Sequence, residues 1–339
     1  MPFDFNKDGF VDLFIGGRDV PFYYGEVPRS YLLQNDGTGK FTDVTSSYSK
    51  ELMNVGLVTG AVSTDVNNDG TPDLVVCSEW GGIEAFINEK KSFRKFSLSE
   101  RKGWWNFVVP VDLDQDGDID FIAGNLGLNS RLKASEKEPI KLYYADFDDN
   151  GRKDQVLTYY LSGKEIPFAN KMELEKQMPI LKKKFLYAED FAKASLPGIF
   201  DQKKLNSAKL FTADYFENAA LINDGNMRFH LQALPYMAQL TSYRDAVDLG
   251  VDQFGKKELL LVGNFYGNNI QMGRYDADFG LVLTCTRNGE FGCESLNGLS
   301  IPGQSRHVRK INIPHQEDAY IIARNDDSLK VIRFLRQMK

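Results

Sequence analysis

Four short segments of the chain place aspartate and asparagine at alternate positions around a glycine, and this spacing could bind a metal ion. The segments read DFNKDGFVD from Asp4, DVNNDGTPD from Asp65, DLDQDGDID from Asp112 and DFDDNGRKD from Asp146. Side chains at positions 1, 3 and 5 of a tight loop converge on one point, and Ca²⁺ binds six to eight oxygen atoms in a flexible shell. The pattern therefore predicts a calcium site in each segment, or about four ions.

The remaining positions of each segment complete the expected shell. Position 6 is glycine in all four copies, where we expect the chain to turn sharply and a Cβ atom to clash. Position 7 can offer its backbone carbonyl, so its side chain is free to vary. The acid at position 9 is expected to close the shell and to begin a strand. The predicted ligands are Asp4, Asn6, Asp8, Phe10 and Asp12; Asp65, Asn67, Asp69, Thr71 and Asp73; Asp112, Asp114, Asp116, Asp118 and Asp120; and Asp146, Asp148, Asn150, Arg152 and Asp154.

Other interpretations of these segments fit less well. An EF-hand loop closes with an acid at position 12 between helices, whereas these segments close at position 9 and an apolar run follows. Mg²⁺ demands near-octahedral geometry, and Zn²⁺ prefers the His and Cys side chains that the segments lack. Turns rich in Asp and Gly also occur without metal. Four gapless copies favour calcium, because their clustered carboxylates would otherwise repel one another.

The elements that must position these loops read as short strands. Apolar runs alternate with turn signals, and Asn-Asp-Gly turns predict hairpins over residues 30–44 and 219–234. A fifth segment from Gly250 keeps Gly255 and Glu258 but lacks the other ligands, so we interpret it as a metal-free copy. Residues 171–208 differ, because Met172, Met178, Leu181, Phe185 and Leu186 have helical spacing and predict short helices in an insertion.

Composition excludes several classes of protein. The chain has 339 residues and a formal net charge of −6, which does not favour nucleic-acid binding. It begins without a basic region and apolar run, so no signal peptide is expected, and no stretch is long enough to span a membrane. Cys285 and Cys293 flank an Asn-Gly turn, where they could form a disulfide across a hairpin or remain buried thiols.

The repeats resemble the FG-GAP/VCBS repeats of integrin-α-like β-propellers. The blocks SYLLQNDGTGKFTDVT, AGNLGLNS and GNFYGNNIQMGRYDADFGL are similar to a bacterial branch of exported proteins that resemble cartilage acidic protein and often carry an ASPIC/UnbV segment. The resemblance implies an all-β fold: one β-propeller domain over residues 1–339, with five to six blades or partial blades visible and a helical insertion at 171–208. Further repeats precede the one at Asp4 in that family. We therefore expect a C-terminal portion of a longer protein, with no innermost strand before the first loop and an incomplete ring of a seven- or eight-bladed parent.

The resemblance and the loops together predict function. We expect a non-catalytic calcium-binding module of an exported, periplasmic or cell-surface protein that binds a protein or carbohydrate ligand in adhesion. The alternatives are a propeller enzyme acting on polysaccharide and a purely structural spacer. His230, His307 and His315 are far apart in sequence and form no recognisable catalytic motif. Trp104 and Trp105 could form a sugar-stacking platform, although core packing is the simpler expectation.

Overall fold

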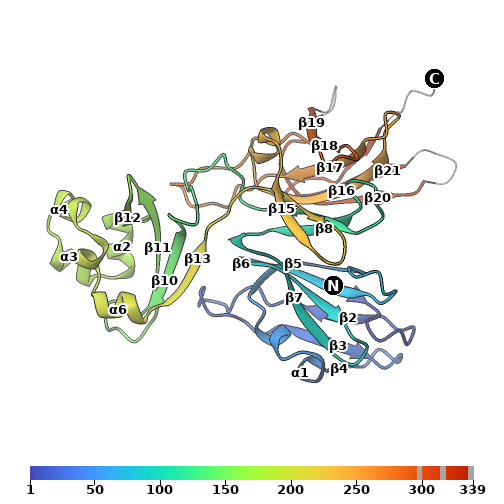
Figure 1. The fold of residues 1–339 in the computed structure, drawn as a ribbon. Helices are drawn as coiled ribbons and strands as arrows, with labels where there is room; N and C mark the ends of the chain where they lie inside the picture. The colour runs from blue at the N-terminus through green and yellow to red at the C-terminus, as the bar shows by residue number, and fades with distance from the viewer. Residues whose placement is uncertain (296–299, 314–317, 335–339) are drawn as a thin grey trace.

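The computed structural model describes residues 1–295, 300–313 and 318–334, and over these residues the chain is built from small antiparallel sheets (Figure 1). The described part contains four sheets of four strands and two of three. Five of them follow one another as a propeller-type array of blades, and one lies apart. The prediction of an all-β fold of small blades is therefore confirmed.

Each blade is a meander of consecutive strands, with one exception described below. The first blade holds β1 (Pro2–Phe3), β2 (Asp12–Ile15), β3 (Tyr31–Asn35) and β4 (Phe41–Asp43), and the second holds β5 (Leu57–Thr64), β6 (Asp73–Asn88) and β7 (Phe93–Trp104). The third holds β8 (Phe107–Val111), β9 (Asp120–Gly124), β14 (Ala219–Asn223) and β15 (Phe229–Ala233). The fourth holds β16 (Tyr243–Val251), β17 (Lys257–Gly263), β18 (Leu281–Cys285) and β19 (Phe291–Ser295), and the fifth holds β20 (Gln304–Ile311), β21 (Ala319–Asn325) and β22 (Lys330–Arg333).

Apolar side chains between neighbouring blades form the core. The second strands β9 and β17 are buried almost throughout, because both of their faces pack against adjacent blades. Trp105, which is fully buried, packs in the cluster between the second and third blades. Core packing is therefore confirmed for Trp105.

The first blade differs from expectation at its start. Residues Pro2–Phe3 form a short strand that pairs with β2, so an innermost strand does precede the first aspartate loop. The last described strand, β22, pairs with β21 in the fifth blade. Within the described ranges no C-terminal strand joins the first blade.

The sheet that lies apart is inserted in the third blade. β9 pairs directly with β14, as in the pair Phe121 and Leu221, so residues 125–218 leave the blade between these strands. They form β10 (Ile140–Ala145), β11 (Asp154–Leu161), β12 (Lys164–Pro167) and β13 (Lys209–Ala213), in the order β12-β11-β10-β13, which Figure 1 shows as a separate lobe. The 34-residue spacing from Asp112 to Asp146 suggests an outer hairpin of the same blade; this interpretation is wrong, because the Asp146 segment connects two strands of the inserted sheet.

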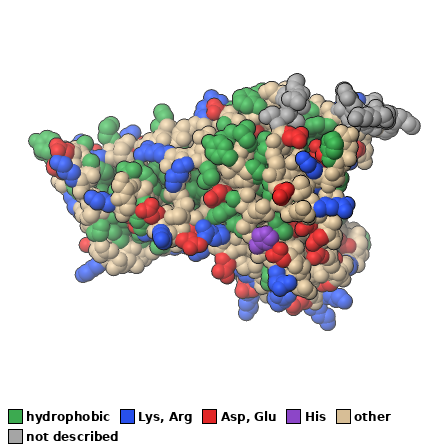
Figure 2. Space-filling model, turned by 45° about the horizontal axis from the view of Figure 1, so that its top comes forward, with side chains coloured by type: hydrophobic (Ala, Val, Ile, Leu, Met, Phe, Trp, Pro, Cys, Tyr) green, Lys and Arg blue, Asp and Glu red, His purple; other side chains and the backbone are tan. Residues whose placement is uncertain are grey.

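Short helices cover this inserted lobe. They are α2 (Lys171–Gln177), α3 (Ile180–Lys184), α4 (Ala188–Lys193), α5 (Leu196–Ile199) and α6 (Gln202–Ser207), whereas α1 (Thr45–Tyr48) lies in the first blade. Met178, Leu181 and Phe185 are buried as expected, but Met172 and Leu186 are 71% and 76% exposed. The segment forms several short helices with different orientations, so one helical periodicity does not predict the buried face along its whole length. On the face in Figure 2, acidic and basic side chains are interspersed over the surface.

The predicted hairpins are also present. β3 pairs with β4, and β14 pairs with β15. In the hairpin of β18 and β19, Cys285 lies opposite Phe291, and Cys293 lies opposite Leu283. This register offsets the two cysteines by two residues, and both are free thiols, so the disulfide is not formed.

Candidate metal centres

The four aspartate segments occupy equivalent places in four hairpins. The first three join the first and second strands of the first three blades, and the fourth joins β10 to β11 in the inserted lobe. In each hairpin the position 9 aspartate begins the second strand, as predicted. The loops of the three blades therefore lie at one end of the array, and the fourth loop lies outside it.

Backbone N–H groups bind the loop carboxylates from inside each segment. In the first loop, the N–H groups of Asp8 and Gly9 donate to the carboxylate of Asp4 at 3.2 and 2.9 Å. The second loop repeats this with Asp69, Gly70 and Asp65 at 3.0 and 2.6 Å. This arrangement fixes the position 1 side chain while leaving lone pairs on its oxygen atoms.

The reason for glycine at position 6 differs from the expected one. Gly9, Gly70, Gly117 and Gly151 have φ angles from 80° to 97°, but a Cβ atom at any of them would meet nothing within 4 Å. The left-handed backbone conformation therefore requires glycine, and a steric clash does not.

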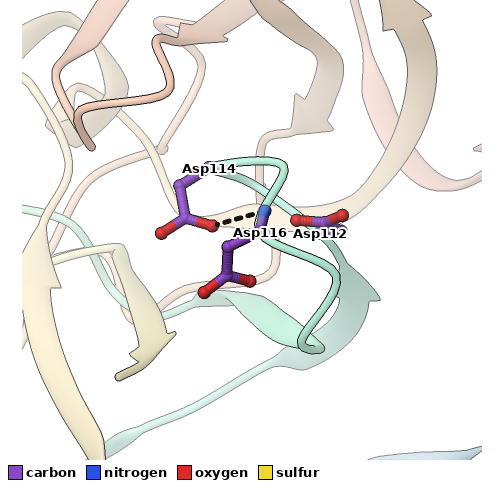
Figure 3. A group of neighbouring side chains, drawn as sticks. All are labelled: Asp112, Asp114 and Asp116. Carbon is purple, nitrogen blue, oxygen red and sulfur yellow. Dashed lines mark hydrogen bonds between the residues drawn. The ribbon is translucent and has the colours of Figure 1, made fainter. Parts of the chain in front are cut away.

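The third loop brings three of its five acidic side chains together (Figure 3). Asp112, Asp114 and Asp116 each offer an oxygen atom within 4.8 Å of the others, and Asp114 accepts a hydrogen bond from the Asp116 N–H at 3.3 Å. Burial, followed by repulsion from Asp116, raises the pKa of Asp114. The fourth loop gathers Asp146, Asp148 and Asp154 in the same way.

Two buried oxygen atoms test whether a cation fits these clusters. Oδ1 of Asp112 and Oδ1 of Asp148 are buried and accept no hydrogen bond from any described residue. A buried carboxylate oxygen without a partner is costly, and a hard cation satisfies it. All the candidate donors are oxygen atoms, which suits Ca²⁺ and not Zn²⁺. The residues present therefore fit a calcium ion.

The position 9 aspartates have an additional structural role. Asp12, Asp73 and Asp120 are buried, and each accepts two hydrogen bonds from backbone N–H groups. One donor is the residue after position 1 of the same loop. The other is an asparagine, which ends the third strand of the first and third blades and ends the long β6 in the second blade. Burial raises the pKa of Asp73 and of Asp120 to about 6 each. These carboxylates therefore connect the loop to the end of the third strand in the first and third blades, and to the far end of β6 in the second.

The partner asparagines were not recognised in the sequence. They are Asn35, Asn88 and Asn223, and each side-chain amide returns a hydrogen bond to the carbonyl before the position 9 aspartate, at 3.1, 3.1 and 3.5 Å. Their recurrence in QNDG, INEK and INDG is the signal that could have identified them.

Position 4 of the loops forms a second set of contacts, which links one blade to the next. Lys7 donates to the carbonyl of Gly70, Asn68 donates to Asp118 at 2.8 Å, and Gln115 donates to the carbonyl of Gly255 at 2.9 Å. These three donors have left-handed φ angles between 56° and 64°, which turn their side chains out of their own loops. The first three candidate centres and the fifth segment are therefore connected along one rim.

Lysine side chains lie beside the remaining two segments. In the fourth loop, Lys204 of α6 contacts Asp149 at 2.7 Å, so position 4 pairs within the inserted lobe. Near the fifth segment, Lys257 contacts Asp248 at 2.6 Å, and Asp252 accepts two backbone N–H groups as an ordinary turn does. Its interpretation as a metal-free copy remains a prediction.

His230 and His307 pair with aspartates that are not among the predicted metal ligands. His230 contacts Asp224 at 2.8 Å on the surface, and His307 lies 3.3 Å from Asp245, which also contacts Arg309. His315 lies outside the described residues. Among the described residues no helix is long and apolar enough to cross a membrane.

Comparison with known proteins identifies one repeat. Residues 65–123 match the model of the FG-GAP-like repeat, a span that runs from the second aspartate loop through the third and into β9. The chain therefore contains an FG-GAP-like repeat, and the resemblance is confirmed over this span. The resemblance to the ASPIC/UnbV branch remains a prediction. No curated protein matches the chain significantly.

Two solved structures are distantly similar to the chain. A crystal structure of BBS1N in complex with ARL6DN, soaked with lead, is 8% identical, with a TM-score of 0.32 over 95% of this chain and 74% of that one. The V. cholerae biofilm matrix protein Bap1 is 8% identical, with a TM-score of 0.28 over 96% of this chain and 57% of that one. Similarity at this level supports no functional conclusion.

Proposed function

We propose that the chain is a non-catalytic calcium-binding recognition module of an exported or cell-surface protein. Calcium would order the loops at one end of the blades, and the array would present a surface that binds a protein or carbohydrate ligand. Metal binding would then stabilise the fold, because it neutralises clustered carboxylates that otherwise repel one another.

The unpartnered oxygen atoms of Asp112 and Asp148 carry this proposal. Each belongs to a cluster of three carboxylates whose oxygen atoms lie within 4.8 Å of one another. Backbone N–H groups already hold the side chains in place, so the clusters need little rearrangement to receive a cation. The first and second loops share the same backbone pattern with asparagine at position 3, which also offers an oxygen atom.

Ser242 is a buried serine at the junction of the third and fourth blades. Its Oγ donates to the carbonyl of Asn125 at 2.9 Å and accepts from Asn106 at 2.8 Å. A serine held in this way has no base to activate it. This serine is therefore a poor candidate for a nucleophile, which is consistent with the recognition function that we propose.

Isothermal titration with Ca²⁺ after chelator treatment tests the metal assignment. We expect binding that Mg²⁺ at the same concentration does not reproduce, and a melting temperature that EGTA lowers. Asp114→Asn should weaken calcium binding at the third loop. The matched control is Asp118→Asn, which removes the same charge from the same loop but keeps the position 7 carbonyl and an oxygen for the contact with Asn68. Melting curves that are identical in EGTA and in Ca²⁺ would refute the proposal.

A further inference from the structure

A second candidate site lies at the end of the blades opposite the aspartate loops. In each of these hairpins the first strand runs toward the loop and the second runs away from it. The start of the first strand and the end of the second therefore meet at the opposite end. A cavity of about 240 Å³ opens there, lined by residues that include Asn106 before β8, Leu126 after β9, Arg244 in β16 and Phe265 after β17. We call this the axial cavity.

The axial cavity carries an excess of positive charge, although the whole chain is acidic. Arg18 at its edge forms an ion pair with Glu79 at 2.5 Å, which offsets the charge of that carboxylate, although Oε2 of Glu79 accepts no hydrogen bond from any described residue. Arg244 and Arg306 form no ion pair with any described carboxylate, and they contact the neutral oxygen atoms of Asn106 and Gln304 at 2.5 and 3.0 Å. Burial, and then the charge of Arg306, lowers the pKa of Arg244 to about 9. This environment favours an added negative charge.

Three buried donors in the cavity lining also lack acceptors. They are Nε of Arg244, Nε1 of Trp104 and Nδ2 of Asn268, and none has a hydrogen-bond partner among the described residues. Nearly all buried polar atoms in proteins are paired, so three unpaired donors at one cavity indicate an absent acceptor. A carboxylate accepts several hydrogen bonds and matches the guanidinium geometry.

Aromatic rings supply the walls of the cavity. Trp104, Phe265 and Tyr275 line it, and Arg244 and Arg306 lie over the Phe265 ring at 4.6 and 5.3 Å from its centre. Trp104 is held by Trp80 and Phe216, whose ring centres lie 5.2 and 5.0 Å away. The volume is below the roughly 300–1,000 Å³ of sites for drug-sized ligands, which suits a single small ring.

We propose that the axial cavity binds a hexuronate, a six-membered sugar ring that bears a carboxylate. The carboxylate accepts hydrogen bonds from Arg244, Trp104 and Asn268, and the ring packs on the aromatic walls. This inference names the ligand class of the recognition function proposed above and rests on that function. It does not depend on calcium at the loops, which lie at the other end of the hairpins.

The cavity favours a hexuronate over other small anions or sugars for physical reasons. A neutral hexose would leave the charge of Arg244 unpaired. An amino acid would bring an ammonium group to a site where Arg18 already neutralises the charge of Glu79 and Arg244 adds a further positive charge. An inorganic anion would leave the aromatic walls exposed to water.

Titration of the full chain with D-galacturonate, followed by calorimetry and by tryptophan fluorescence, tests this inference. A single sugar should bind with a Kd of about 1 mM, and galactose should bind at least tenfold more weakly. Equal affinity for galactose, tighter binding of inorganic sulfate than of galacturonate, or no binding at about 10 mM galacturonate would overturn it.

Variants separate this site from a general loss of structure. Arg244→Gln should weaken galacturonate binding at least tenfold, and Trp104→Phe, which keeps the ring and removes the N–H, about fivefold. Asn268→Ala supplies a third test in a loop, where the change leaves the strands intact. The control Arg94→Gln removes a surface arginine that pairs with Glu89, and it should bind like the unaltered chain. Folded Trp104→Phe and Asn268→Ala variants that both bind normally would refute the assignment.

The calcium assignment can fail independently. Asp114→Asn should leave galacturonate binding unchanged, because it alters only the loop end. Loss of calcium binding together with intact galacturonate binding would refute the metal centre alone. Intact calcium binding without galacturonate binding would refute the axial site alone.

Discussion

Asp114→Asn should change the stability of the chain in opposite directions with and without calcium. Without metal, Asp114 faces the carboxylates of Asp112 and Asp116, with oxygen atoms within 4.8 Å. Two unit charges at that distance repel by about 0.9 kcal/mol in water, so the two contacts together cost about 2 kcal/mol. The asparagine removes this repulsion and keeps an oxygen atom for the Asp116 N–H. Without calcium, the variant should therefore be more stable by about 1–2 kcal/mol at low salt.

With calcium bound, the same substitution removes a charged ligand. A tenfold to hundredfold loss of affinity reduces the stabilisation from saturating metal by about 1.4–2.7 kcal/mol. The predicted sign therefore reverses. Urea unfolding of both proteins in EGTA and in excess Ca²⁺, each at low and high salt, measures all the terms. An effect of the same sign in both conditions would refute the assignment of a cation to this loop. Asp118→Asn alters a side chain outside the cluster of three carboxylates and keeps the position 7 carbonyl, so it should show no reversal.

Three further predictions concern other parts of the chain. Asn88→Ala should lower the free energy of unfolding by about 2–3 kcal/mol in urea titration, because its buried amide donates to two carbonyls. Asn35→Ala should cost less than half of that, because Asn35 is only partly buried and its amide donates to one carbonyl. The buried carboxyl of Asp278 has a pKa raised to about 7 by burial, so its stabilising contribution is complete below about pH 4 and is lost as pH rises through 7. Asp73 and Asp120, with pKa values of about 6, also lose stability over this range, so from pH 4 to 8 in EGTA the free energy of unfolding should decline by about 4 kcal/mol less in Asp278→Ala than in the unaltered chain. Lys204→Met should leave calcium binding at the first three loops unchanged and alter binding only at the fourth, because Lys204 contacts Asp149 and the carbonyl of Phe147 in that loop. A calorimetric titration in which binding changes at all the sites would contradict this.

The loops were recognisable from the sequence because their chemistry depends on residue types at fixed spacing. Aspartate at positions 1 and 9 and glycine at position 6 determine the local conformation wherever the segment occurs. The position 4 contacts were not recognisable, because Lys7, Asn68 and Gln115 share no residue type and reach loops at least 50 residues away. The axial cavity could not be predicted from the sequence either, because its lining residues are far apart in the chain and come from four blades.

The inserted lobe shows a second limit of the sequence pattern. Its strands, such as KLYYA and DQVLTYYL, have the same apolar character as blade strands. Only the pairing of β9 with β14 reveals that the chain has left the blade and returned. The spacing predicts the helices but not the exposure of Met172 and Leu186, because each short helix turns its own apolar face toward the sheet and the faces of successive helices are not aligned.

The position of this lobe has a consequence for how the chain folds. Pairing β9 with β14 requires residues 125–218 to close as one loop, which slows folding because non-local contacts form late. Within the lobe, however, Ile140 of β10 pairs with Ala213 of β13, so the lobe brings its own ends together. If the lobe folds first, the flexible chain between β9 and β14 becomes several-fold shorter, and the entropic free-energy cost of closing that loop falls by about 1 kcal/mol. The inserted lobe would then fold before the third blade is complete and bring β14 close to β9 for pairing.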